Sequence, residues 1–203
     1  MKDMRLVVEK GYDSGDYYGF YRKNRKLHSF EQFLFKELQK KVQKGKLLDL
    51  GCGPGVPYDK YFVKQGYNVT GVDLSQKHID IANKNVRAKF VKADFSKYKF
   101  KDKYDIIVSF FAIFHIPKEE HGALFKKMFS ILNTEGCILI TLGKEETKAS
   151  EEDFIGAKMM WSSNTSETSL NLLQQAGFKI LFSALESITH NGEETHLWVL
   201  AQK

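Results

Sequence analysis

Apolar and polar residues recur along the chain with two different periods, and the changes of period divide it into helices and strands. Between residues 27 and 44, apolar side chains recur every three or four positions, as on one face of an amphipathic helix. Short apolar runs bounded by glycine or polar residues instead predict buried strands. The expected strands are 46–50, 68–72, 89–92, 104–110, 137–142, 179–185 and 196–201. The expected helices are 27–44, 56–66, 77–86, 121–132 and 167–176.

Strands and helices alternate regularly from residue 46 to residue 142. This order is typical of parallel strands joined by right-handed helical crossovers, with helices on both faces of one sheet. The last two strands have no helix between them, and Asn191 and Gly192 lie in the turn that joins them. At least one of these two strands must therefore be antiparallel. The pattern predicts one α/β domain over residues 1–203.

A glycine-rich turn, Gly51-Cys52-Gly53-Pro54-Gly55, follows the first strand of this alternation. Glycines let the backbone turn tightly and approach a ligand, and the next helix offers unpaired N–H groups. A dinucleotide loop carries G-x-G-x-x-G, but the sixth position here is Val56, and the P-loop lysine motif is absent. The spacing from Asp49 instead favours a ligand that ends in an amino acid, because backbone groups can meet its carboxylate and ammonium.

Two further acids follow the second and third strands. Asp73 lies twenty residues beyond Gly53, where a carboxylate accepts ribose hydroxyls in Rossmann-type sites. Asp94 ends the third strand and precedes Phe95, a pair suited to the amino group and ring of an adenine. Three acids at successive strand ends beside a glycine loop indicate a nucleoside-containing ligand.

These motifs resemble those of the class I S-adenosylmethionine-dependent methyltransferases. The resemblance rests on LLDLGCGPG, GVDLS, KADF, YDIIVSF and LNTEGCILIT, in that order between residues 45 and 142. It implies a three-layer Rossmann-like fold whose seven-stranded, mostly parallel sheet has the order 3-2-1-4-5-7-6, with the last strand antiparallel. It also implies S-adenosylmethionine as cofactor and S-adenosylhomocysteine as product. On this basis we divide the domain into an N-terminal arm (1–26), a cofactor-binding half (27–142) and a part with a lid segment, the last helix and the terminal strands (143–203).

The resemblance implies a role for each cofactor-binding position. The methionyl part would be held by Asp49, Gly51, Cys52, Gly53 and Gly55. Asp73 would bind the ribose, Leu74 would pack on the adenine, and Asp94 and Phe95 would line the adenine pocket. Ser109 and Phe110 would face the sulfonium and the amino group.

His115 follows the fourth strand, where many small-molecule members of the family also have a histidine. It is the first candidate for a general base, and the alternative is a histidine that only binds loop backbone. Aromatic residues gather in the arm, after the fourth strand and near Trp161. Neither the arm nor the polar stretch 143–166 shows a period long enough to predict a separate core. We expect the residues that line the acceptor pocket to be Tyr17, Tyr18, Tyr21, Phe111, Phe114, Met160 and Trp161. The alternative is that these residues only pack the arm and the lid segment together. We also expect the cofactor to order the arm, with a tyrosine near the ligand.

Differences from the signatures of known methyltransferase subfamilies narrow the range of possible methyl acceptors. Ser109-Phe110-Phe111-Ala112 stands where DNA amino-methyltransferases carry an Asp/Asn/Ser-Pro-Pro-aromatic motif. The chain also lacks the cysteines of arsenite and cytosine-C5 enzymes and the carboxylates of metal-dependent catechol enzymes, so no metal is expected. A small-molecule acceptor is therefore favoured. The alternatives are methylation of RNA or protein, and adenosylmethionine binding without catalysis.

Composition changes this picture little. The 203 residues carry a formal charge of +6, but the lysines are scattered and often alternate with acids. We therefore expect a solvated basic surface in place of a nucleic-acid groove, although basic patches do bind phosphates. No apolar run has the length of a signal peptide or of a membrane span, and two cysteines make no disulfide framework. A cytoplasmic location is expected, and the oligomeric state stays open.

Overall fold

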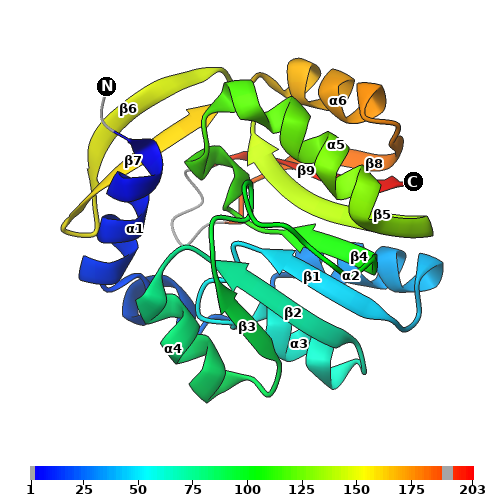
Figure 1. The fold of residues 1–203 in the computed structure, drawn as a ribbon, viewed down its shortest axis with the longest axis horizontal. Helices are drawn as coiled ribbons and strands as arrows, with labels where there is room; N and C mark the ends of the chain where they lie inside the picture. The colour runs from blue at the N-terminus through cyan, green and yellow to red at the C-terminus, as the bar shows by residue number, and fades with distance from the viewer. Residues whose placement is uncertain (1–2, 189–193) are drawn as a thin grey trace.

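Seven strands form one sheet in the computed structural model, which describes residues 3–188 and 194–203 (Figure 1). They are β1 (Lys46–Leu50), β2 (Asn68–Asp73), β3 (Lys89–Lys92), β4 (Tyr104–Ser109), β5 (Leu132–Gly143), β8 (Lys179–Glu186) and β9 (His196–Gln202). Their order is β3-β2-β1-β4-β5-β9-β8, and β9 is antiparallel to both of its neighbours. Counted within this sheet alone, the order is 3-2-1-4-5-7-6, so the predicted fold is confirmed. The turn predicted at Asn191 and Gly192 lies outside the described residues.

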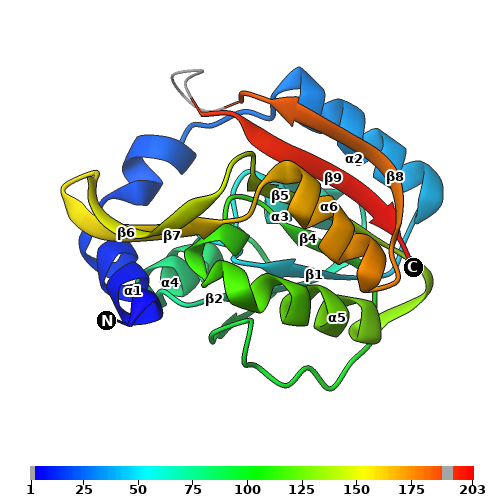
Figure 2. The same ribbon diagram turned by 90° about the horizontal axis from the view of Figure 1, so that it is seen from above.

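Helices cover both faces of the sheet (Figure 2). They are α2 (Ser29–Lys41), α3 (Tyr58–Lys64), α4 (Gln76–Asn85), α5 (His121–Ile131) and α6 (Ser166–Gln175). Side chains of α2 and α3 pack on one face, and those of α5 and α6 pack on the other. Side-chain caps fix where two of these helices begin: His28 and Glu31 form a capping box at the N-terminus of α2, and Ser75 caps the N-terminus of α4. No helix of the described ranges is long and apolar enough to cross a membrane.

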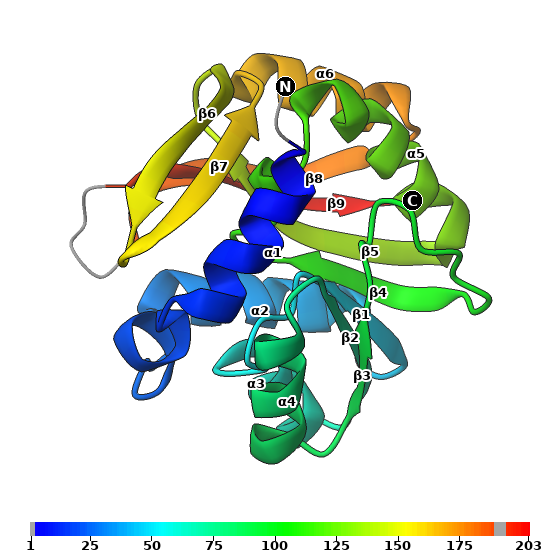
Figure 3. The same ribbon diagram turned by 60° about the vertical axis from the view of Figure 1, so that its left-hand side comes forward.

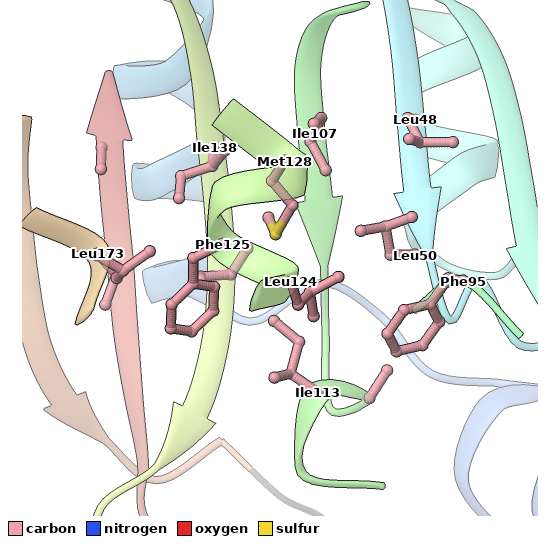
Figure 4. Close-up of a cluster of buried hydrophobic side chains, with 14 of the residues drawn as sticks. Leu48, Leu50, Phe95, Ile107, Ile113, Leu124, Phe125, Met128, Ile138 and Leu173 are labelled. Carbon is pink, nitrogen blue, oxygen red and sulfur yellow. The ribbon is translucent and has the colours of Figure 1, made fainter. Parts of the chain in front are cut away.

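The larger core lies between the sheet and helices α5 and α6 (Figure 4). Leu124, Phe125 and Met128 project from α5 onto Ile107 of β4 and Ile138 of β5. Burying one such side chain stabilises a fold by about 1.5–3 kcal/mol, so this cluster is a main source of stability. It fixes the central strands, and these strands position the loops at their carboxyl ends.

The arm and the polar stretch 143–166 form regular structure, so the expectation that they contribute no separate core is wrong. The arm folds into α1 (Met4–Ser14) and a short π-helical turn, η1 (Tyr18–Arg22). The polar stretch forms a two-stranded hairpin of β6 (Thr147–Phe154) and β7 (Ala157–Ser163). Figure 3 shows α1 lying between this hairpin and α4. Met4 and Val8 pack against Met159 and Met160 in a small third core.

Two local features explain why the pattern did not reveal these elements. Met4, Val7, Val8 and Tyr12 do have helical spacing, but the run is only eleven residues long and is interrupted by charges. The hairpin turn has positive φ at Ile155 (53°) and Gly156 (72°). Such turns usually carry Asn-Gly, and a β-branched residue at positive φ is uncommon.

Candidate active site

Helix α1 crosses the carboxyl edge of the sheet, where the loops after β2, β3 and β4 meet (Figure 3). At least one polar contact ties the helix to each of these loops. The contacts are Ser75 Oγ to Asp13 Oδ1 (2.6 Å), Arg5 Nε to Asp94 Oδ2 (2.6 Å) and Tyr12 Oη to His115 Nε2 (2.8 Å). The N-terminal arm is therefore the roof of the site.

The glycine loop needs glycine at two positions for different reasons. At Gly51, with φ of 83°, an added Cβ would lie 2.2 Å from the Cβ of Ala112. At Gly53, with φ of 54°, an added Cβ would meet nothing within 4 Å. Gly51 thus allows close packing of the loop on the segment after β4. Gly53 leaves its backbone open toward the cavity, as a ligand cradle requires.

Asp73 accepts two backbone hydrogen bonds at the end of β2. Gly53 N–H donates to one carboxylate oxygen (2.8 Å), Ser75 N–H donates to the other (2.9 Å), and His78 Nδ1 lies 3.3 Å away. Burial opposes ionisation, but His78 and the two amides lower the pKa of Asp73 below its ordinary value. The side chain is therefore a carboxylate that also braces the glycine loop.

Asp49 lies next to a second buried acid, Asp59 of α3, which the sequence analysis missed. Burial raises the pKa of both carboxyl groups, and each lies beside the other and near Asp73. No N–H or hydroxyl group in the described part of the chain donates to either oxygen of Asp59. The raised pKa values favour a form of the pair in which at least one of the two carboxyl groups is protonated.

A small cavity of about 40 Å³, here named the loop cavity, is enclosed by the glycine loop and the arm. The predicted cofactor residues that line it are Asp49, Gly51, Cys52, Gly53, Asp73 and Phe110. Its roof is formed by Tyr12, Tyr17 and Arg22. The space suits about one water molecule and is far smaller than a nucleoside.

Five predicted cofactor positions lie outside the lining of the loop cavity: Gly55, Leu74, Asp94, Phe95 and Ser109. The Ser109 hydroxyl donates to the Leu50 carbonyl (2.6 Å) and is fully buried, so here it braces two strands. Asp94 is paired with Arg5 and accepts from Ser96. The structure thus places most methionyl candidates and the ribose candidate around the loop cavity, whereas the adenine candidates do not line it, although the Phe95 ring lies close to Gly51.

A larger cavity of about 490 Å³, here named the aromatic cavity, adjoins the loop cavity. The predicted pocket residues that line it are Tyr17, Tyr21, Phe111, Phe114 and Trp161. Tyr18 and Met160 are not among its lining residues, and the Met160 side chain packs in the third core. Both cavities are lined by Tyr12, Tyr17, Arg22, Phe111 and His115.

His115 lies in the short turn η2 (Ile113–His115), where the two cavities meet. Its Nδ1 lies 2.9 Å from the Met160 carbonyl, which can only accept, so Nδ1 carries the proton. Nε2 therefore accepts from the Tyr12 hydroxyl. Burial lowers the pKa of His115 to about 4 and raises that of Tyr12, so both are neutral near pH 7.

Phe111 has a φ of 58°, which is uncommon for a bulky side chain. Its N–H donates to Thr141 Oγ1 (2.6 Å), and its ring packs edge-on against Trp198. Such backbone strain concentrates at functional sites. Here the conformation places one ring in the wall of both cavities.

Comparison with known proteins identifies the domain. A family model described as "Methyltransferase domain" matches residues 47–136, which span β1 to the start of β5. Residues 47–136 therefore form a methyltransferase domain, and the sheet that contains them has the class I fold. The predicted family and fold are thereby confirmed, and the cofactor of this family is S-adenosylmethionine.

Relatives of the methyltransferase domain differ in what they act on. Ubiquinone biosynthesis O-methyltransferase of Actinobacillus pleuropneumoniae is 25% identical over 124 residues, 56% of this chain and 52% of that protein. Ribosomal protein L11 methyltransferase of Dictyoglomus turgidum is 32% identical over 149 residues, 71% of this chain and 42% of that protein. The chain thus spans about half the length of the curated relatives it matches.

The solved structure of magnesium protoporphyrin IX methyltransferase from Synechocystis PCC 6803 with bound SAM shares the fold, with a TM-score of 0.72. It is 16% identical in sequence, and the match covers 100% of this chain and 98% of that one.

Several residues in and around the two cavities were not predicted. His78 and Asp59 carry no motif that marks them, since each contributes only through the fold. Arg22 and Arg25 did have a signal, because the run from Arg22 to Lys26 holds four cations beside the arm tyrosines. Averaging the charge over the whole chain concealed this cluster.

Proposed function

We propose that this chain transfers a methyl group from S-adenosylmethionine to a small-molecule acceptor. The observation that carries the proposal is the shared wall of the two cavities, formed in part by His115 and Phe111. A donor in the loop cavity and an acceptor in the aromatic cavity would meet there. The aromatic cavity, at about 490 Å³, also falls within the size range of small-molecule sites.

The residues around the loop cavity fit the cofactor chemically. Gly53 presents open backbone, and Asp49 Oδ1 and His78 Nε2 are buried without a hydrogen-bond partner in the described ranges. Unpaired buried polar atoms of this kind are costly unless a ligand meets them. We assign the methionyl part to the loop from Asp49 to Gly55 and the ribose to Asp73. For the adenine we retain Leu74, Asp94 and Phe95.

When bound, adenosylmethionine supplies an electrophilic methyl group on a sulfonium. The protein's contribution is to align the acceptor with that methyl and to exclude water. Rings of the aromatic cavity provide the dry walls. A neutral His115, with its Nε2 lone pair at the shared wall, is our candidate for taking the acceptor's proton. Ser109 and Phe110 remain candidates for the wall beside the sulfonium.

Methylation of a protein or RNA is the second candidate, since one relative acts on a ribosomal protein. The size and aromatic lining of the aromatic cavity favour the small molecule, because a macromolecular acceptor would have to insert a side chain or base past the arm. If methyl transfer occurs only when a protein or an RNA is supplied as acceptor, the second candidate is correct.

Cofactor binding is the direct test. Isothermal titration should show binding of S-adenosylhomocysteine and S-adenosylmethionine and no measurable binding of NAD.

Asp73→Asn removes the charge assigned to the ribose and also one of the two oxygens that accept from the Gly53 and Ser75 N–H groups. It should weaken S-adenosylhomocysteine binding by about 1.5–3 kcal/mol, or roughly 10- to 150-fold. The exposed Asp80→Asn on α4 is the matched control and should bind normally. Preference for NAD would end the proposal, and normal binding by Asp73→Asn would refute the ribose assignment.

A further inference from the structure

The segment between η1 and α2 concentrates positive charge at the mouth of the aromatic cavity. It contains Arg22, Lys23, Arg25 and Lys26. Three of these cations, all except Lys23, line both the aromatic cavity and an outer groove of about 610 Å³. We name this outer space the basic groove, and its other lysines are Lys23, Lys36, Lys60 and Lys64. Arg22, Arg25 and Lys26 therefore form a junction between the two spaces.

Arg22 is the innermost cation of the junction and is only 8% exposed. Its guanidinium carbon lies 5.2 Å from the ring centres of Tyr17 and Tyr58 and 5.6 Å from that of Phe111. In the described ranges, no carboxylate lies within ion-pair distance of it. Ring faces stabilise a cation, but a buried charge normally also needs an anion.

Arg25 is only partly neutralised. It pairs with Glu31 (2.7 Å), and that carboxylate also accepts from the Tyr58 hydroxyl (2.5 Å) and the His28 N–H (2.7 Å). Nη1 of Arg25 is buried and lacks an acceptor in the described part of the chain. Lys26 is exposed beside it and makes no ion pair with a described residue. Both side chains thus have donors available at the junction.

The charge balance of the aromatic cavity and of the basic groove is positive. The described lining of the aromatic cavity includes three cations and one acid, Glu194. Among the described residues that line the basic groove, none is acidic. A positive field at the entrance of a cavity with low-polarity walls attracts anions and selects for them. The aromatic rings farther inside select for a flat apolar body.

We propose that the methyl acceptor is an aromatic molecule that carries an anionic group, and that the anion binds at the junction of Arg22, Arg25 and Lys26. This inference rests on the proposed methyltransferase function. The aromatic body lies among Tyr17, Phe111 and Trp161, with the reacting atom toward His115. A carboxylate, sulfonate or phosphate group adds a second negative charge to the three cations of the junction, of which Arg25 already has Glu31 as a partner.

A small anion fits these observations better than a nucleic acid does. Arg22 lines both spaces but is only 8% exposed, so a phosphate backbone that lies along the basic groove reaches little of it. Binding of RNA along the basic groove would depend instead on the outer lysines Lys36, Lys60 and Lys64. The two possibilities therefore assign importance to different lysines.

A matched pair of dyes tests the anion requirement without an identified acceptor. 8-Anilinonaphthalene-1-sulfonate and N-phenyl-1-naphthylamine share one aromatic body and differ by the sulfonate. We expect the sulfonate to bind at least about 10-fold more tightly, as a hydrogen-bonded charge should. Lys26→Gln and Arg25→Gln should each weaken binding of the sulfonate dye by about 3- to 30-fold and leave the affinity for the neutral dye unchanged. Lys36→Gln, which alters only the basic groove, should change neither dye.

Titration of each variant with S-adenosylhomocysteine shows whether it is folded and separates the two proposals, since neither Lys26 nor Arg25 lines the loop cavity. If the wild type does not bind S-adenosylhomocysteine, the proposed function is wrong, whatever the dyes show. Equal binding of the two dyes, or no effect of Lys26→Gln, would overturn the anionic acceptor. Displacement of the sulfonate by a single-stranded RNA, with loss of RNA binding in Lys36→Gln, would also overturn it in favour of a nucleic-acid groove.

Discussion

His115 is held by two hydrogen bonds that determine both its orientation and its protonation. The Met160 carbonyl, from β7, keeps the proton on Nδ1, and the Tyr12 hydroxyl, from α1, covers Nε2. With a pKa near 4, the ring is almost entirely neutral at physiological pH. A base must have its lone pair available, so an acceptor would have to displace Tyr12 or pass its proton through the Tyr12 hydroxyl.

His115→Gln should lower kcat by about 10²- to 10⁴-fold, the usual contribution of a positioned base. It should lower the affinity for S-adenosylhomocysteine far less than it lowers kcat, because His115 lines the wall shared by both cavities and makes no hydrogen bond to the glycine loop or to Asp73. The rate of the wild type should be constant above about pH 5 and fall below about pH 4, as His115 becomes protonated. The measurement is formation of S-adenosylhomocysteine with an acceptor that the wild type methylates.

Tyr12→Phe is the companion variant, since it keeps the ring and removes only the hydroxyl. A relay through Tyr12 predicts that its kcat falls with that of His115→Gln. Displacement of Tyr12 predicts that its kcat is kept. An unchanged kcat in His115→Gln would reduce the histidine to a residue that ties the β4 loop to the hairpin.

At the scale of elements, α1 determines access to the site. It is joined to the loops after β2, β3 and β4, and the turn that follows it brings Tyr17 and Arg22 over the glycine loop. The loop cavity beneath has room for about one water molecule. A nucleoside cofactor can therefore enter only if the arm, or the side chains that it carries, moves outward.

Hydrogen exchange should detect this movement. We expect S-adenosylhomocysteine to change the exchange of amides in α1 and η1, while α5, which lies in the larger core, stays unchanged. Trp161 should report the same event by a change in fluorescence, since it lines the aromatic cavity and its ring lies 5.9 Å from that of His115. Equal exchange of the arm with and without the ligand, and unmoved Trp161 fluorescence, would show that the arm is ordinary packing.

The central sheet could be predicted from the sequence because its signals are local. Apolar runs ended by glycine or aspartate predict strands, and the observed β1 and β3 have the expected bounds, although β3 at the sheet edge is only partly buried. The hairpin could not be predicted, because its turn lacks the usual residues. The third core could not be predicted either, because α1, which forms part of it, is short. For the site, the glycine loop and Asp73 were visible as motifs. Arg5 and Asp59 were not, since their partners are distant in sequence and meet only in the fold.

At the scale of the whole molecule, the Asp49–Asp59 pair couples stability to pH. The folded protein holds a proton between two buried carboxyl groups whose pKa values are raised by burial. The unfolded chain releases that proton near pH 4, the ordinary range of aspartate. Between that pH and the raised folded pKa, the folded state binds more protons than the unfolded state. Stability contributed by the pair is therefore fully present at low pH and is lost as the pH rises through this window.

Asp59→Asn should remove this dependence. An amide is neutral at every pH, and its NH₂ group can donate to the Asp49 carboxylate in place of the shared proton. We therefore expect the variant to be more stable than the wild type at pH 8, by about 1 kcal/mol or more, and the difference to shrink toward pH 5. Asp59 is fully buried and does not line the loop cavity, so cofactor binding need not be lost. Urea unfolding followed by tryptophan fluorescence from pH 5 to pH 8 gives the two stability curves. The exposed Asp80→Asn should run parallel to the wild type. A parallel curve for Asp59→Asn would mean that the pair holds no extra proton in the folded state.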